Sequence, residues 1–146
     1  MQTTSHKVGL VVFPAFDWAI TPDHPEREER LLYTRDQIVE EGLLDVPGIE
    51  EFRPGIAADV EINRAHICVP SVDNVITESH RIAAGGTITA ADLVLTGRVN
   101  RSFALLRPPG HHANRIVHGS RGFCTINNEA IMVEHIRRTY GSHLRI

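Results

Sequence analysis

The sequence predicts an α/β fold built on a parallel sheet. Two short runs are almost wholly apolar, at residues 7–13 and 102–106, and such runs are typical of strands buried on both faces. Apolar residues recur at helical spacing in three longer segments, at residues 26–41, 72–95 and 127–138. Strands that alternate with helices favour right-handed crossovers and parallel pairing. The 146 residues fit one small domain, so we expect a single domain over residues 1–146.

The first half of the chain opens with a strand. Residues 7–13 read KVGLVVF, and Pro14 ends the run because proline has no N–H to donate to a ladder. A helix over 26–41 follows, with Gly42 as its C-cap. Its apolar positions are Leu31, Leu32, Ile38 and Val39. Prolines and glycines then predict a loop, with at most a short strand at residues 49–52 and a weak helix at 57–65.

The second half holds the most helical part of the chain. We expect a helix over 72–95 with Gly97 as its cap, and the Gly85-Gly86 pair inside it predicts a kink or a close backbone contact. A phosphate-cradling loop is the sharper interpretation of that pair, although no glycine-rich nucleotide motif accompanies it. The helix over 127–138 turns Ile131, Val133 and Ile136 inward, and residues 144–146 resemble the start of a further strand.

Composition excludes several classes of protein. A net charge of −3 and a sequence pI near 6.3 argue against direct nucleic-acid binding. No segment approaches the ~18 apolar residues of a membrane span, and the start of the chain lacks the layout of a signal peptide. Two cysteines, Cys68 and Cys124, make no disulfide framework. We therefore expect a cytoplasmic protein without a membrane partner.

Charge is unevenly distributed along the chain. Residues 1–78 hold 15 acidic and 6 basic residues, whereas residues 79–146 hold 3 and 9. The two halves therefore either pair electrostatically or solvate different faces of the protein.

One loop concentrates the candidate chemistry. Residues 107–112 read RPPGHH and directly follow the predicted strand at 102–106, where α/β proteins place functional residues. Two prolines stiffen the loop, and Gly110 permits a sharp turn. His111 and His112 are candidate general bases or metal ligands, with a structural role as the alternative. Neighbouring side chains on an extended loop diverge, which disfavours one metal ion held by both.

The motifs of this loop resemble those of a known family. RPPGHHA followed by GFCTINNEA is similar to the signature of the histone deacetylase family, which includes acetylpolyamine amidohydrolases and acetoin-utilisation proteins. DHPEREER at 23–30 and ESHRIAAGGTITAADLVLTG at 78–97 resemble two further family motifs, in the same order. The resemblance implies a three-layer α/β/α fold of the arginase/deacetylase type. It also implies zinc-dependent removal of acetyl groups from acetyl-lysine or related acylated amines.

The resemblance assigns roles to individual residues. His111 and His112 match the tandem catalytic histidines, of which one takes a proton from the attacking water and the other assists the leaving amine. The matches to the substrate channel and its rim are Gly122, Phe123, Arg30 and Pro25. Glu28 departs from the pattern, since the family more often has proline there. Cys124 is expected to be a small buried residue rather than a nucleophile.

The zinc ligands of the family have no match in this sequence. The family holds its ion with an Asp-x-His motif and a later aspartate, and no Asp-x-His occurs among the 146 residues. We therefore expect an N-terminal part of a deacetylase domain that binds no zinc and has no activity alone. We expect a homo-oligomer or a complementary C-terminal half as partner. Three further histidines, expected on the surface or satisfied in the core, are His66, His80 and His135.

Two other functions stay open at this point. The chain is alternatively a non-catalytic binding or assembly module that oligomerises, or pairs with a separate C-terminal half, through an exposed sheet edge. A third hypothesis is a metal-binding fragment that uses His111 and His112 with ligands from another subunit.

Overall fold

The computed structural model describes residues 6–14, 21, 23–67, 76–117 and 119–146. Three strands form one parallel sheet in the order β2-β1-β3, so the first strand is central. The strands are β1 (Val8–Val12), β2 (Ile49–Phe52) and β3 (Arg101–Leu105). The helices are α1 (Glu28–Glu40), a short 3-10 helix (Leu43–Asp45), α2 (Asp59–Ala65), α3 (Glu78–Leu95) and α4 (Asn128–Tyr140).

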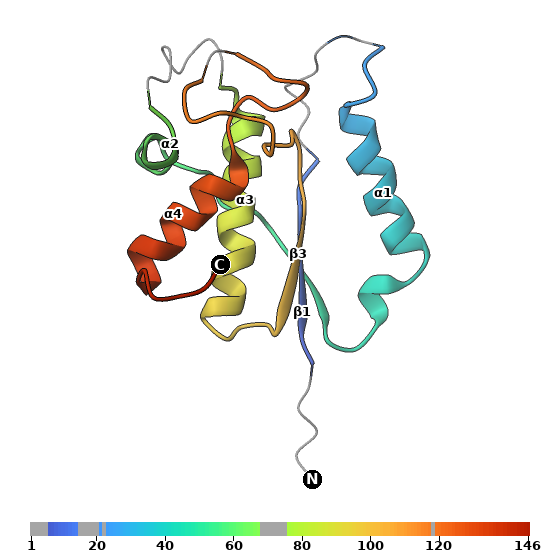
Figure 1. The fold of residues 1–146 in the computed structure, drawn as a ribbon. Helices are drawn as coiled ribbons and strands as arrows, with labels where there is room; N and C mark the ends of the chain where they lie inside the picture. The colour runs from blue at the N-terminus through green and yellow to red at the C-terminus, as the bar shows by residue number, and fades with distance from the viewer. Residues whose placement is uncertain (1–5, 15–20, 22, 68–75, 118) are drawn as a thin grey trace.

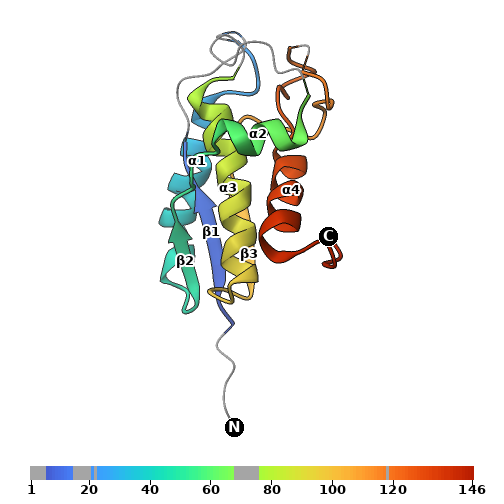
Figure 2. The same ribbon diagram turned by 90° about the vertical axis from the view of Figure 1, so that its left-hand side faces the viewer.

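Helices lie on both sides of the sheet, as the predicted three-layer architecture requires. In Figure 1, α1 lies on one side of the sheet and α3 on the other; α4 packs on the outer side of α3, and α2 packs on α4. Figure 2 shows α3 and α4 running side by side with α2 across their upper ends. The strands run upward in Figure 1, so the segment that follows β3 lies at the upper end of the sheet, where it contacts His24 and Glu26.

The largest buried apolar cluster joins α2, α3 and α4 to the loops above them. Its fully or nearly buried members are Ala57, Ile62, Ile76, Ala84, Ile88, Val117, Ile126 and Ile131. Val117 and Ile126 belong to the segment between β3 and α4, so these two side chains anchor that segment to the core. Burial of such aliphatic side chains stabilises the layer by about 1.5–3 kcal/mol for each side chain.

The glycine pair of α3 makes the close backbone contact that the sequence predicts. A Cβ at Gly85 would lie 2.2 Å from the carbonyl oxygen of Gly55, and one at Gly86 would lie 2.1 Å from a methyl group of Leu106. The Thr89 hydroxyl accepts a hydrogen bond from the Gly55 N–H at 2.9 Å. Glycine at position 85 therefore lets the chain before α2 cross α3 at backbone distance.

Two predicted elements need correction. The helix expected over 72–95 begins at Glu78; residues 72–75 lie outside the described residues, and Ile76 and Thr77 are not helical. The first turn is capped because the Thr77 N–H donates to Nδ1 of His80 at 3.2 Å. Residues 144–146 do not form a strand. Leu144 and Ile146 instead line an apolar groove of about 250 Å³ with α3 and α4.

Other boundaries agree with the sequence to within a few residues. The short strand at residues 49–52 forms as predicted, and Gly42 takes the left-handed conformation (φ +67°) directly after α1. The inward face of α1 is narrower than predicted: Leu31 is fully buried, whereas Val39 is 48% exposed.

The acidic and basic halves of the chain pair with each other. Glu50 accepts from Arg98 at 2.7 Å, and Asp59 pairs with Arg81. Both pairs join an acidic residue of the first half to an arginine of the second, as the electrostatic interpretation predicts, whereas Arg27, Arg35 and Arg137 pair within their own half. None of the described helices is both long enough and apolar enough to cross a bilayer.

Candidate active site

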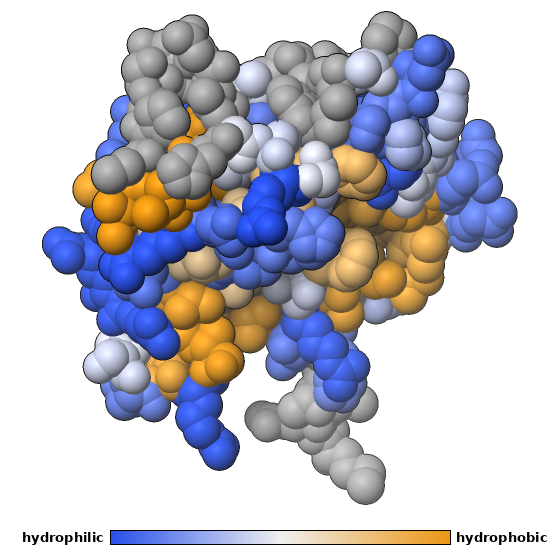
Figure 3. All heavy atoms as spheres, turned by 45° about the horizontal axis from the view of Figure 1, so that its top comes forward, coloured by the Kyte–Doolittle hydropathy of each residue, from blue (hydrophilic) through white to orange (hydrophobic). Residues whose placement is uncertain are grey.

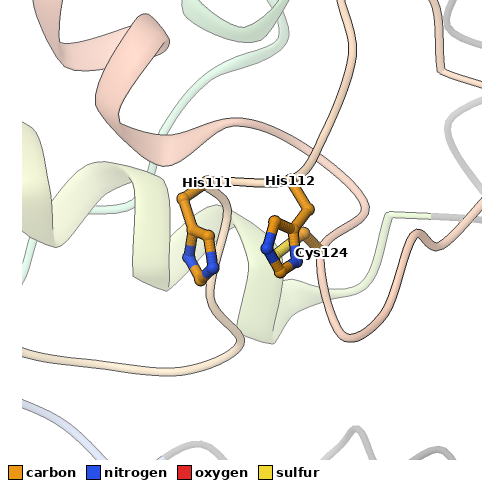
Figure 4. Close-up of side chains that lie close together, drawn as sticks. All are labelled: His111, His112 and Cys124. Atoms are coloured by element: carbon orange, nitrogen blue, oxygen red, sulfur yellow. The ribbon is translucent and has the colours of Figure 1, made fainter.

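The tandem histidines lie at the carboxyl end of β3, in the loop that leads toward α4 (Figure 1). The Ala113 N–H donates to the Gly110 carbonyl at 3.0 Å, so His111 and His112 occupy the middle of a turn. Their ring centroids are 4.0 Å apart, with 63° between the ring planes. Figure 4 shows both rings on the same side of the loop, with Cys124 beside His112. The expectation that the two side chains diverge is wrong, because the backbone here is a turn rather than extended.

This turn rests directly on the start of α4. A Cβ at Gly110 would lie 2.4 Å from the backbone nitrogen of Asn128 and 2.6 Å from the Ile126 carbonyl oxygen. The Asn128 side chain donates to the Pro108 carbonyl at 3.1 Å and is itself buried. Both histidines are exposed, so a rigid buried base presents two accessible imidazoles.

A buried ion pair fixes the root of the loop. Arg107 is fully buried, and its Nε donates to Oε1 of Glu26 at 2.8 Å; Glu26 is 5% exposed. The half-exposed Arg30 donates to the second oxygen of the same carboxylate at 3.0 Å. The contact joins the 23–30 segment to the histidine loop across 81 residues. No motif of the sequence predicts this pair; its one signal is an arginine placed directly after an apolar strand, where a buried charge requires a partner.

His66 ties the far end of the loop to α2 and α4. Its Nε2 accepts from the Asn127 N–H at 2.9 Å, which leaves Nδ1 to donate to the Asn114 carbonyl at 3.0 Å. Burial lowers the pKa of His66, because the charged imidazolium is poorly solvated there. His66 is thus a satisfied core histidine, as expected. Its contact with the segment that follows His112 was not foreseen.

We expect the free energy of unfolding to fall as the pH is lowered from 7 to 5. The unfolded chain, whose His66 keeps the ordinary pKa of 6.5, binds the extra proton more tightly than the folded chain does. Urea unfolding at the two pH values measures the difference. His66→Gln should reduce the difference in unfolding free energy between pH 7 and pH 5, whereas the exposed His143→Gln should leave that difference unchanged. An identical pH dependence in wild type and His66→Gln would contradict the assignment.

The residues predicted to line a channel surround the same end of the sheet. The Phe123 and His24 rings meet edge to face with centroids 4.5 Å apart, and Phe123 is 37% exposed. Gly122 has φ +58°, and a Cβ there would lie 3.4 Å from Nδ1 of His112. Pro25 is exposed and adjoins His24 in sequence, while Arg30 is held by Glu26. The structure therefore brings Gly122 to His112 and Phe123 to His24, and places Pro25 and Arg30 in the segment of His24.

One cluster of possible metal ligands occurs among the described residues. The donor atoms of His111, His112 and Cys124 all lie within 4.8 Å of one another. Cys124 is 1% exposed, and burial raises the pKa of its thiol, so the protonated form that does not ligate metals is favoured. Binding an ion here would also occupy the lone pairs needed for proton transfer. These residues therefore do not fit the catalytic zinc of the family, and the expectation that this chain alone binds none stays a prediction.

Comparison with known proteins shows which family the chain resembles. The histone deacetylase domain model matches residues 67–146. A probable deacetylase of Archaeoglobus fulgidus is 36% identical over 132 residues, covering 78% of this chain and 36% of that protein. The polyamine deacetylase HDAC10 of Rattus norvegicus is 48% identical over 61 residues, covering 42% of this chain and 10% of that protein.

A solved structure agrees with the sequence comparisons. The HDA15 HD domain superposes with a TM-score of 0.73 at 26% identity, over 92% of this chain and 44% of that one. The chain thus spans 36% of the length of the Archaeoglobus fulgidus protein and 44% of the HDA15 HD domain chain, less than half of each. Since the domain model covers more than half of its residues, and the tandem histidines stand where the motifs predict them, this chain belongs to the histone deacetylase family.

Proposed function

We propose that this chain supplies the proton-transfer part of a zinc-dependent deacetylase active site. The observation that supports the proposal is the pair of exposed imidazoles 4.0 Å apart, with the Phe123 segment beside them. General acid–base catalysis requires such groups within reach of one reacting centre, and it contributes about 10²–10⁴-fold to a rate. The substrate class that we propose is acetyl-lysine or a related acylated amine.

The side chains have separate parts in this proposal. One imidazole accepts a proton from the attacking water, and the other donates a proton to the nitrogen of the leaving amine. The half-exposed Phe123 ring offers an apolar wall for the methylene groups of an acylated amine. Glu26 and Arg107 act as positioning residues, because they hold the loop without touching the substrate.

A chimaeric enzyme tests the proposal. The aligned segment of the Archaeoglobus fulgidus protein is replaced by this chain, and turnover of an acetyl-lysine peptide is measured with zinc present. We expect the chimaera to be active and His111→Ala or His112→Ala to lower kcat by about 10²–10⁴-fold. The isolated chain should show no turnover under the same conditions.

The exposed His143→Ala serves as the matched control in the chimaera and should keep the full rate. Full activity of both tandem-histidine variants in a folded chimaera would sink the proposal. So would turnover by the isolated chain that disappears in His112→Ala, because the chain would then be a complete catalyst.

A second candidate function is assembly through the free edge of β3. Within the described residues β3 pairs with β1 alone, and Phe103 in its middle is 60% exposed. Phe103 lines an apolar groove of about 170 Å³ with residues of β1 and α1. Hydrophobic side chains reach the surface in patches in Figure 3. Unpaired edges and apolar patches favour contact with another chain, and we propose a cytoplasmic homo-oligomer or a complementary C-terminal half as the partner.

Light scattering tests self-assembly by measuring the molar mass of the chain in solution. We expect a dimer or larger species at about 100 µM, which Phe103→Arg should convert to monomer by placing a charge in the apolar contact. The exposed Tyr33→Arg on α1 is the control and should not change the mass. A monomeric wild-type chain would exclude self-assembly.

A further inference from the structure

A polar cavity of about 360 Å³ lies on the side of the chain away from the sheet. It is bounded by the end of α2, the segment after His112 and the first turns of α4, which come together at the upper right of Figure 2. Its volume falls in the range of sites that hold small organic molecules, about 300–1,000 Å³. The chemistry of its lining therefore indicates which molecule it suits.

Two arginines face this cavity from different segments. Arg64 lies in the last turn of α2, and Arg115 lies three residues after His112. Backbone pairing brings the segments together, because the Ile67 N–H donates to the Arg115 carbonyl at 2.8 Å. The His66 bond to Asn114 reinforces the same pairing. The two arginines are thus brought to the lining of one cavity by a backbone hydrogen bond and the His66 contact.

The positive charge of these arginines is not compensated within the described part of the chain. Neither guanidinium makes a hydrogen bond or an ion pair there. Seven of the twelve other arginines form ion pairs, namely Arg27, Arg30, Arg35, Arg81, Arg98, Arg107 and Arg137, so a lack of ion pairs alone does not mark a site; what Arg64 and Arg115 share is one cavity. Glu134, the acidic residue in the lining, pairs with Arg137 at 3.1 Å. The lining therefore holds two arginines that make no ion pair within the described residues, beside one carboxylate, Glu134, that is paired with Arg137.

We propose that this cavity binds the phosphate group of a small phosphate monoester. A phosphate monoester carries about −1.5 to −2 charges at pH 7, which two guanidinium groups balance. The planar fork of arginine matches phosphate oxygens in bidentate geometry. The N-terminus of the 13-residue α4 borders the cavity and adds positive potential. The remaining volume accommodates the organic part of the ligand.

Isothermal titration of the full chain with glucose 6-phosphate tests the site, with glucose as the uncharged probe and citrate as the carboxylate probe. We expect glucose 6-phosphate to bind and glucose not to bind. Arg64→Ala and Arg115→Ala should each weaken binding about tenfold or more, because each removes a charge-assisted hydrogen bond. Both side chains reach solvent-accessible space, and circular dichroism verifies that the variants stay folded.

Arg101→Ala is the matched control, because Arg101 is exposed, makes no ion pair within the described residues and lies at the start of β3. It should bind as the wild type does. Equal losses in all three variants would mean unspecific attraction and would overturn the site. Absence of binding at millimolar phosphate ester would overturn it too. Equal binding of citrate would overturn the assignment to phosphate. The outcome is independent of deacetylase activity, since no catalytic residue is changed.

Discussion

Gly85→Ala is expected to destabilise the chain by about 3 kcal/mol, the upper part of the range for overpacked sites. In an unconstrained helix the same change stabilises by about 1 kcal/mol, because alanine has the higher helix propensity. Here the added methyl group would lie 2.2 Å from the Gly55 carbonyl oxygen and 2.7 Å from the Ala57 nitrogen. Both are backbone atoms, so no side-chain rotation relieves the clash, and α3 must separate from the segment before α2.

Urea unfolding monitored by circular dichroism measures this effect. Gly97→Ala is the comparison. A Cβ at Gly97 would meet no atom within 4 Å, so only the backbone conformation (φ +73°) opposes the added methyl group. Its cost should be about 1 kcal/mol. If Gly85→Ala proved as stable as wild type, the close contact between α3 and Gly55 would be wrong.

Glu26→Gln is expected to cost about 3–5 kcal/mol, the range for breaking a buried ion pair by removing one partner. The amide keeps the shape of the side chain but removes the negative charge that faces the fully buried Arg107. Arg30 loses the same partner, although its half-exposed position makes that loss small. The effect should therefore come almost entirely from the buried guanidinium.

Glu28→Gln is the control in the same urea experiment. Glu28→Gln removes an equal charge two residues away, from a side chain that forms no ion pair within the described residues, and should change stability by less than about 0.5 kcal/mol. Arg107→Met with Glu26→Leu should recover much of the loss, since apolar residues of similar volume often replace a buried pair at little cost. Equal stability of Glu26→Gln and Glu28→Gln would contradict the buried pair.

The secondary structure could be predicted wherever local pattern decides it. The apolar runs at β1 and β3 are short, rich in aliphatic residues and bounded by proline or polar residues, and both strands form within one or two residues of the prediction. The predicted start of α3 was too early, because apolar residues at helical spacing also occur before Thr77 in the sequence. The helix begins after Thr77 because the Thr77 N–H bonds to His80, a contact that depends on side-chain geometry. The apolar Leu144 and Ile146 line a groove with α3 and α4 instead of forming a strand. Contacts with these two helices decide this outcome, and the local sequence pattern does not reveal them.

The candidate site could be predicted only in part. Motif order and loop position were enough to select His111 and His112. They do not reveal that the backbone turns there, and so the side chains were expected to diverge. The Glu26–Arg107 pair joins residues 81 positions apart, and no local pattern connects them. The role of His66 likewise depends on Asn114 and Asn127, which approach it only in the folded chain.

The five residues of β1 hold the whole sheet together, because β1 is its central strand. Because β1 is the shared partner, β2 and β3 have no ladder with each other. A product that started translation after Val12, or a protease cut that released β1, would leave two isolated strands and no backbone ladder to hold the histidine loop over its base. The integrity of β1 is thus a precondition for the placement of His111 and His112, which follow it by about a hundred positions.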